Sequence, residues 1–85
     1  MSFGKWTRLQ IQNTGLTWVE FQKRSGFTSG VLQQWTSDDR RPRLSSFIVF
    51  CEVIATVQMR PFDVVLIEGL THMSEYQYAV KRGVK

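Results

Sequence analysis

The stretch LTWVEFQKRSGFTSGVLQQW, residues 16–35, decides the fold because it contains two helix starts on either side of a glycine. Thr17 and Glu20 have the spacing of a capping box, in which the threonine hydroxyl accepts a hydrogen bond from the glutamate amide and the glutamate carboxylate accepts one from the threonine amide. Gly26 can adopt the left-handed backbone conformation that ends many helices. These signals predict a helix over residues 17–25 that ends at Gly26.

A second helix is predicted directly after this glycine, over residues 28–36. Thr28 is a good N-cap residue because its hydroxyl can accept a hydrogen bond from an amide of the first turn. Val31, Leu32 and Trp35 recur at helical spacing and form one apolar face. The opposite face carries small and amide side chains, namely Ser29, Gly30, Gln33 and Gln34. This helix is therefore expected to bury one stripe and to present a polar stripe to solvent.

Three further helices are predicted around this pair, over residues 5–13, 45–57 and 61–68. The first is expected to stop at Thr14-Gly15. The second has Ser45 as its candidate cap and is apolar almost all round, so it is expected at the centre of the core. Its apolar residues at helical spacing are Phe47, Phe50, Cys51, Ile54 and Val57.

The helix over residues 61–68 is expected to begin at Pro61, whose fixed φ suits a first helical position, and to end at Gly69. The β-branched pair Val64-Val65 leaves a strand as the alternative there. Residues 37–43 are polar and charged and include a proline, which predicts a surface loop.

The C-terminal segment, residues 74–85, is assigned to a basic tail that follows a domain of residues 1–73. Residues 76–80 alternate weakly between polar and apolar side chains, as a strand does, and the alternative is a frayed tail. Three basic residues lie near the end of the chain: Lys81, Arg82 and Lys85. In either form the tail is a candidate dimerisation segment.

The composition is that of one small globular domain. Of the 85 residues, 42% are hydrophobic and 21% are charged, so one core can form and disorder is not indicated. The longest apolar run, residues 47–51, is far shorter than the ~20 residues that a membrane span needs. Residues 1–10 lack the pattern of a signal peptide, so a cytoplasmic protein without membrane contact is expected. The net charge of +4 favours a polyanion as partner.

Catalytic and metal chemistry is not indicated. The chain has one cysteine, Cys51, and one histidine, His72, which excludes an internal disulfide and provides no metal-ligand cluster. Cys51 is expected to be a buried small hydrophobic residue. The carboxylates show no paired spacing, and there is no nucleophile elbow or phosphate-binding glycine loop. We therefore expect no enzyme activity, no cofactor and no small-molecule ligand.

Two short helices joined at a glycine, followed by a basic loop and an apolar helix, resemble the lambda repressor/Cro family, also called XRE-type helix-turn-helix proteins. The likeness rests on Leu16, Thr17, Phe21, Gly26, Phe27, Leu32 and Trp35 around the turn, on Arg41-Pro42-Arg43-Leu44, and on Phe47, Ile48, Phe50, Cys51 and Ile54. The chain departs from the family pattern at Gln22, where alanine is usual, at Ser25, where an apolar residue is usual, and at Gly30. The likeness covers residues 16–57 most clearly.

The resemblance implies an all-α, five-helix lambda-repressor-like domain whose third helix enters the major groove of DNA. It implies base contacts by Thr28, Ser29, Gly30 and Gln34, and phosphate contacts by Thr17 and Trp18. Gln33 is adjacent and points outward, so it is a further candidate for a base contact. The basic loop adds phosphate contacts by Arg40, Arg41 and Arg43, with the minor groove or a merely solvated loop as the alternatives. A glutamine amide can pair with adenine through a donor and an acceptor at once. For Trp18 two interpretations stay open, because its indole N–H can donate to a phosphate or its ring can simply pack.

The resemblance also implies a function. We expect a sequence-specific transcriptional regulator, a phage or bacterial Cro-type repressor that binds double-stranded DNA at a palindromic operator as a homodimer in the cytoplasm of a bacterial cell. Its dimer surface would come from the fifth helix and residues 76–80. The alternative is a protein–protein interaction module on the same fold, such as an antitoxin or a regulatory adaptor.

Overall fold

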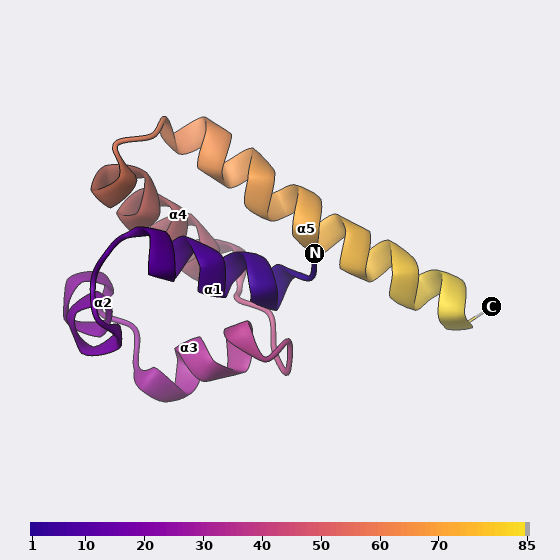
Figure 1. Cartoon of the computed structure of the whole chain (residues 1–85). Helices are drawn as coiled ribbons and strands as arrows, with labels where there is room; N and C mark the ends of the chain where they lie inside the picture. The colour runs from indigo at the N-terminus through magenta and orange to yellow at the C-terminus, as the bar shows by residue number, and fades with distance from the viewer. Residues whose placement is uncertain (85) are drawn as a thin grey trace.

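In the computed structural model, residues 1–84 form five helices and no strand (Figure 1). They are α1 (Phe3–Asn13), α2 (Trp18–Ser25), α3 (Ser29–Thr36), α4 (Leu44–Gln58) and α5 (Phe62–Val84). The structure describes the backbone of residues 1–84 and the side chains of residues 1–73. The expectation of an all-α chain is therefore confirmed, and both strand alternatives, at 64–65 and at 76–80, are wrong.

The local signals around Gly26 act as expected. Thr17 Oγ1 accepts a hydrogen bond from the Glu20 amide at 3.1 Å, and Glu20 Oε1 accepts one from the Thr17 amide at 3.0 Å. Thr28 Oγ1 accepts one from the Val31 amide at 3.2 Å, which caps α3. Gly26 ends α2 with a φ of 81°. The two helices thus begin within one residue of their expected starts and are joined by a tight turn.

The core is built around Phe50 of α4, which is 1% exposed. Its ring lies 5.8 Å from that of Phe21 on α2 and 6.1 Å from those of Trp6 on α1 and Trp35 on α3, measured between ring centroids. Leu32 of α3 is also fully buried. The apolar faces expected for the helices over residues 28–36 and 45–57 therefore meet in the core, together with Phe21 of α2.

The first helix begins at Phe3, two residues earlier than predicted. Ser2 Oγ accepts a hydrogen bond from the Lys5 amide, and Asp38 Oδ1 accepts one from the Gly4 amide at 2.7 Å. The carboxylate of Asp38 thus satisfies an amide at the helix N-terminus, where negative charge is also favoured by the helix dipole. Asp38 lies 34 residues further along the chain than Gly4, so the residues around Gly4 alone do not indicate this hydrogen bond.

The start of α4 also differs from the prediction. The helix begins at Leu44, with Arg43 in the N-cap position and no side-chain hydrogen bond to the first turn. Ser45 therefore lies inside the first turn, and its assignment as the cap is wrong. Residues 37–43 form the expected non-helical connection.

The last helix corrects the sequence prediction most. It begins one residue after Pro61 and runs through Gly69 to Val84, across the expected boundary between residues 73 and 74. A Cβ on Gly69 would lie 2.5 Å from Phe47 Cζ and 2.8 Å from the Trp6 ring. This glycine therefore lets α5 approach α4 and α1 closely and does not end the helix. The side chains of residues 74–85, including the tyrosines expected at the dimer surface, lie outside the described residues.

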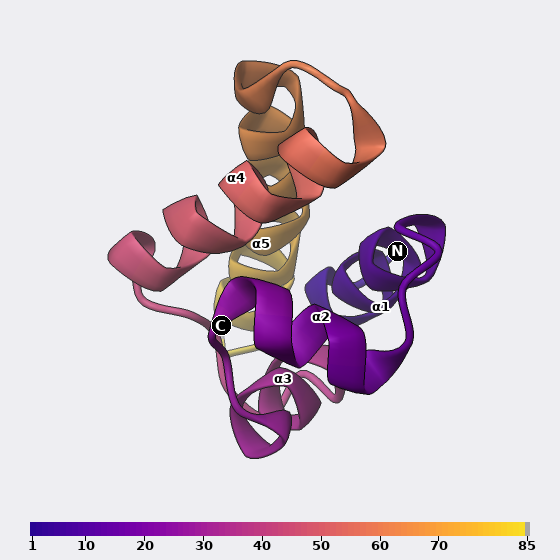
Figure 2. The same ribbon diagram turned by 90° about the vertical axis from the view of Figure 1, so that its left-hand side faces the viewer.

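Figure 2 shows how the five helices are arranged in space. The pair α2 and α3 lies at one end of the molecule, while the turn between α4 and α5 lies at the other. The helix α1 packs against α3, α4 and α5, so it lies between the helix pair and the long last helix. Within the part of the chain that is described, no helix combines the length and the apolar character needed to cross a membrane.

The two helical glycines Gly69 and Gly30 predict opposite effects of the same substitution. Gly69→Ala is expected to destabilise the fold by about 1–3 kcal/mol, because the added methyl group overpacks the core. Gly30→Ala is expected to stabilise it by about 0.5–1 kcal/mol, because a Cβ there meets nothing within 4 Å and alanine favours the helix. Urea unfolding followed by circular dichroism measures both. A Gly69→Ala protein as stable as the wild type would contradict the close approach of α5.

Candidate nucleic-acid interface

The outward face of α3 carries the strongest candidate for a recognition surface. Gln33 and Gln34 are exposed, and their side-chain amides have no hydrogen-bond partner within residues 1–73. The same helix is held from behind by Leu32 and Trp35, which are 0% and 5% exposed. The amides therefore stand on a fixed support and keep both donor and acceptor for an outside partner.

The first residues of α3 are more engaged with the protein than their sequence suggested. The Thr28 hydroxyl caps the helix, and Ser29 Oγ accepts a hydrogen bond from the Trp18 indole N–H at 3.0 Å. Each hydroxyl can still donate its own proton to an outside acceptor. Gly30 is exposed and adds no side chain to this face.

The indole of Trp18 joins the start of α2 to the start of α3. Its ring is half-buried and packs against the core, and its N–H is used by Ser29. This geometry favours the interpretation in which Trp18 packs over the one in which it donates to a phosphate. Thr17 remains exposed at the same helix start.

The three arginines of the loop do not behave alike. Arg40 and Arg43 are exposed, and their guanidinium groups have no hydrogen-bond or ion-pair partner among the described residues. Arg41 is half-buried and donates from Nη1 to the carbonyl oxygen of Met73 on α5, at 3.1 Å. The guanidinium of Arg41 therefore ties the loop to α5, whereas the other two reach solvent.

A basic residue that the sequence prediction missed lies beside α3. Arg8 of α1 is exposed and lines two adjoining surface hollows, of about 470 and 340 Å³, that run between α1 and α3. The first hollow is lined by Arg8, Gly30, Gln33, Gln34, Thr36, Ser37 and Asp39. The expected helix over residues 5–13 placed Arg8 on a helix, but only the packing of α1 on α3 brings it next to the two glutamines.

Two titratable groups, Glu20 and Cys51, have shifted pKa values. Two hydrogen bonds from Thr17 lower the pKa of Glu20, which keeps that carboxylate ionised as the capping box requires. Burial raises the pKa of the Cys51 thiol to about 12, so it is not a nucleophile at neutral pH. His72 packs near Trp6 and lies 3.2 Å from the Met1 carbonyl oxygen. Among the described residues no cluster of potential metal ligands occurs.

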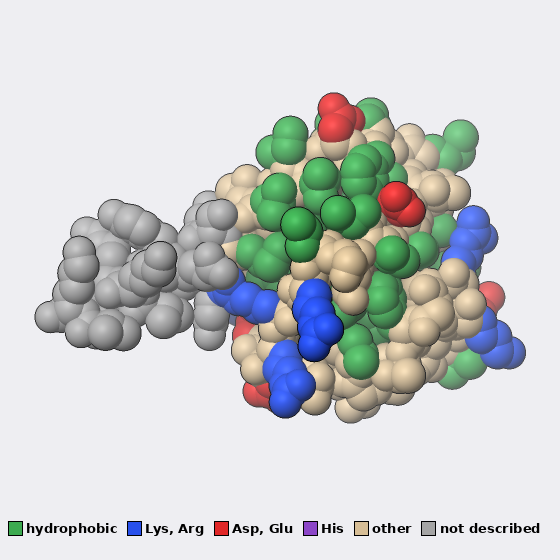
Figure 3. All heavy atoms as spheres, turned by 180° about the vertical axis from the view of Figure 1, so that it is seen from behind, with side chains coloured by type: hydrophobic (Ala, Val, Ile, Leu, Met, Phe, Trp, Pro, Cys, Tyr) green, Lys and Arg blue, Asp and Glu red, His purple; other side chains and the backbone are tan. Residues whose placement is uncertain are grey.

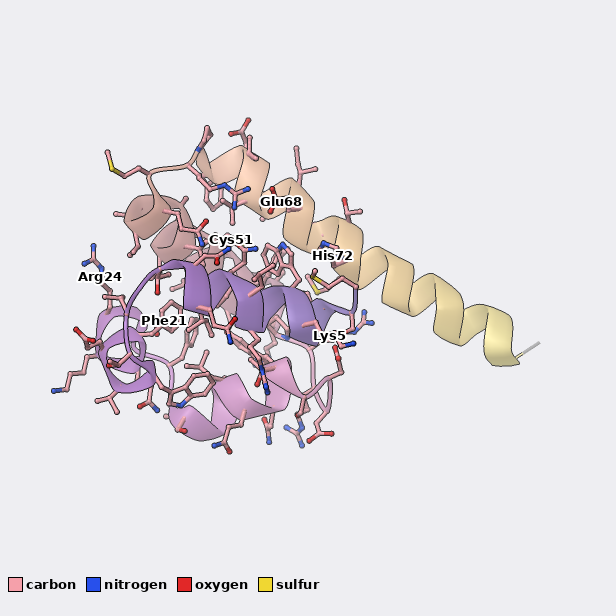
Figure 4. All side chains as sticks on the ribbon, in the orientation of Figure 1. Lys5, Phe21, Arg24, Cys51, Glu68 and His72 are labelled. Carbon is pink, nitrogen blue, oxygen red and sulfur yellow. The ribbon has the colours of Figure 1, made fainter. Side chains whose placement is uncertain are left out.

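Figure 4 places the labelled groups relative to these helices. Phe21 and Cys51 lie inside the bundle, while Arg24 extends from α2 away from α3. Glu68 of α5 pairs with Arg60 and accepts a 3.4 Å hydrogen bond from the Trp6 indole. Arg60 and Glu68 thus join α5 to the rest of the fold. Neither residue lines the hollows beside α3.

The bond between Trp18 and Ser29 predicts a measurable coupling. Trp18→Phe keeps a ring but removes the N–H, and Ser29→Ala removes the acceptor, so each is expected to cost about 1 kcal/mol of unfolding free energy. The double variant is expected to cost clearly less than the sum, because both changes remove the same bond. Urea unfolding of the four proteins gives the coupling. Strict additivity would show that this bond does not stabilise the protein.

No protein-family model, curated protein or solved structure matches this chain in the three comparisons made.

Proposed function

We propose that the protein is a sequence-specific DNA-binding transcriptional regulator of the Cro type, with a lambda-repressor-like arrangement of its five helices. The observation that carries this proposal is the α3 face, where Gln33 and Gln34 are exposed and unpartnered on a helix whose other side is locked into the core. A helix of this kind can enter the major groove, and glutamine amides are suited to read adenine there.

The connection between α2 and α3 supports the same proposal. A helix-turn-helix needs a short turn and a fixed angle between its helices. Here Gly26 makes the turn, and the Trp18 indole donates a hydrogen bond to Ser29 across it. The ring centroids of Phe27 and Trp35 lie 4.8 Å apart. The pair is thus rigid enough to present α3 while the start of α2 meets the DNA backbone.

Phosphate contacts are assigned to Thr17, Arg40 and Arg43, which are exposed around this face. Thr17 lies at the start of α2, where the helix dipole favours an anion, although its amide and the Glu20 amide are already used in the capping box. Arg41 holds the loop on α5 and so positions Arg40 and Arg43, which lie on either side of it in the loop.

The proposed regulator binds as a homodimer, because one such module reads few bases. The outer side of α5 is apolar and exposed, with Val64 at 42%, Ile67 at 61% and Leu70 at 38%. Figure 3 shows hydrophobic side chains gathered on the face of the bundle opposite to the one seen in Figure 1. A second copy of α5 is the proposed occupant of this surface. To read two half-sites, such a dimer has to place its recognition helices about 34 Å apart, one turn of DNA.

A protein-interaction module is the second candidate, and the same apolar surface favours it. Under this proposal the α5 surface binds a different protein, as in an antitoxin or an adaptor, and the α3 face is only solvated. DNA binding and self-association distinguish the two functions, and each can be measured separately.

The DNA-binding proposal predicts a sequence-dependent loss for Gln34→Ala. In a gel-shift assay with fragments from beside the gene, the wild-type protein is expected to select one fragment. Gln34→Ala is expected to weaken that complex by about 1–3 kcal/mol while leaving weak general binding intact. Thr56→Ala, an exposed change on α4, is the control and should bind as the wild type does. Uniform weak binding of the wild type to every fragment, lost steeply with salt, would contradict sequence-specific regulation.

The dimer proposal predicts that Ile67→Glu yields a monomer that stays folded. The side chain is 61% exposed in the single chain, so a charge there costs little within one copy but is buried unpaired in the dimer. Sedimentation equilibrium measures the mass, and circular dichroism measures the helix content. Val19→Glu, on an exposed position of α2, is the control. A wild-type protein that is monomeric while it occupies its site would exclude the dimer.

A further inference from the structure

A surface hollow lies between α1 and α3 and is lined by Arg8, Gln33, Gln34 and Ser37, among others. What we infer from it rests on the proposed DNA binding and extends it. The two helices run in opposite directions side by side. The start of α1 meets the end of α3, since a Cβ on Gly4 would lie 2.6 Å from the Thr36 carbonyl oxygen. A strip of exposed α1 residues therefore runs along α3.

Within that strip Arg8 is the cation next to the recognition face. It lines both hollows, and Gln33 lines both with it. Lys5 and Gln12, at helical spacing from it, are exposed on the same helix. Arg8 is therefore the basic residue of α1 that lines the same hollow as the two glutamines.

Arg8 also differs from the arginines that serve the fold. Arg60 is bound to Glu68, Gln10 and Gln58, and Arg41 is bound to the Met73 carbonyl oxygen. The guanidinium of Arg8 has no hydrogen-bond or ion-pair partner within residues 1–73. Its five N–H donors are thus available to a ligand from outside.

The chemistry of the hollow suits an anionic oxygen. Arg8 supplies a planar cation that can hold two phosphate oxygens at once. The Gln33 side-chain amide supplies a neutral donor, whereas the Ser37 hydroxyl donates its proton to the Gln33 carbonyl oxygen, with 2.8 Å between the two oxygens. Asp39 is the one acid in the lining, and its charge opposes an anion at that end. The favoured position for an anion is therefore the Arg8 end of the hollow.

We propose that Arg8 binds a backbone phosphate of the DNA that α3 reads, so that α1 is a third helix of the interface. The phosphate lies in the hollow between Arg8 and Gln33, which fixes how deeply α3 enters the groove. This contact positions the protein and carries no sequence information.

The test is a salt titration of binding to a short mixed-sequence duplex, with the full chain. Replacing Arg8 by glutamine is expected to weaken binding to all sequences and to lower the slope of log affinity against log salt by about 1, one phosphate contact. Arg8→Lys keeps the charge and is expected to keep most of the slope. Arg24→Gln, on the part of α2 that points away from α3, removes an equal charge and should leave the slope unchanged.

The outcomes separate this inference from the function on which it rests. If Arg8→Gln keeps the wild-type slope while Gln34→Ala loses its preferred fragment, Arg8 is not a phosphate ligand and the DNA-binding function stands. An equal loss of slope for Arg24→Gln would show only an effect of net charge and would also overturn the inference. A wild-type protein that binds no duplex overturns both. Circular dichroism and urea unfolding confirm that each variant is folded.

Discussion

The ring of Phe50 is the contact on which the rest of the structure depends. It comes from α4 and meets an aromatic ring from each of α1, α2 and α3. A helix of eight residues, such as α2 or α3, is too short to be stable alone in water. Both therefore take their stability from the side chains that they bury against this ring. The polar face of α3 points to solvent because Leu32 and Trp35 are held on the opposite side.

The last helix adds a second constraint, which concerns distance. Gly69 has no side chain, so α5 lies against Phe47 and Trp6 at a spacing that any larger residue would prevent. From that position α5 accepts a hydrogen bond from Arg41 at the Met73 carbonyl oxygen and, through Glu68, another from the Trp6 indole. The loop after α3 is thus fixed to the same helix that carries the exposed apolar surface. The proposed recognition and dimer surfaces are joined by rigid contacts.

What could be predicted from the sequence depended on the range of each interaction. The capping box of Thr17 and Glu20 and the turn at Gly26 involve neighbours along the chain, so their residues alone indicate them. The amphipathic stripes of α3 and α4 have a fixed period, which predicted Leu32 and Phe50 as core residues. These two kinds of signal were enough for the order of the helices and for the pair at the candidate site.

Several features that escaped prediction need a partner far along the chain. Gly69 has the residue type that ends helices, and only the nearby Phe47 and Trp6 rings show that it serves close packing. The start of α1 depends on Asp38, and Arg41 depends on a carbonyl oxygen of α5. The role of Arg8 depends on which helix lies beside α1. No local pattern of residues encodes such contacts, so they appear only once the fold is known.

The contacts within the protein also decide which cations remain available to DNA phosphates in the proposed regulator. Trp18 and Arg41, both expected at phosphates, are engaged within the protein. The exposed and unpartnered cations assigned to the DNA backbone are then Arg8, Arg40 and Arg43. Because each phosphate contact contributes about 0.9 to the salt slope, one copy would bind any DNA only weakly at physiological salt. A second copy doubles these contacts and adds a second set of glutamines, so the proposed regulator depends on its dimer surface for affinity as well as for the length of the site that it reads.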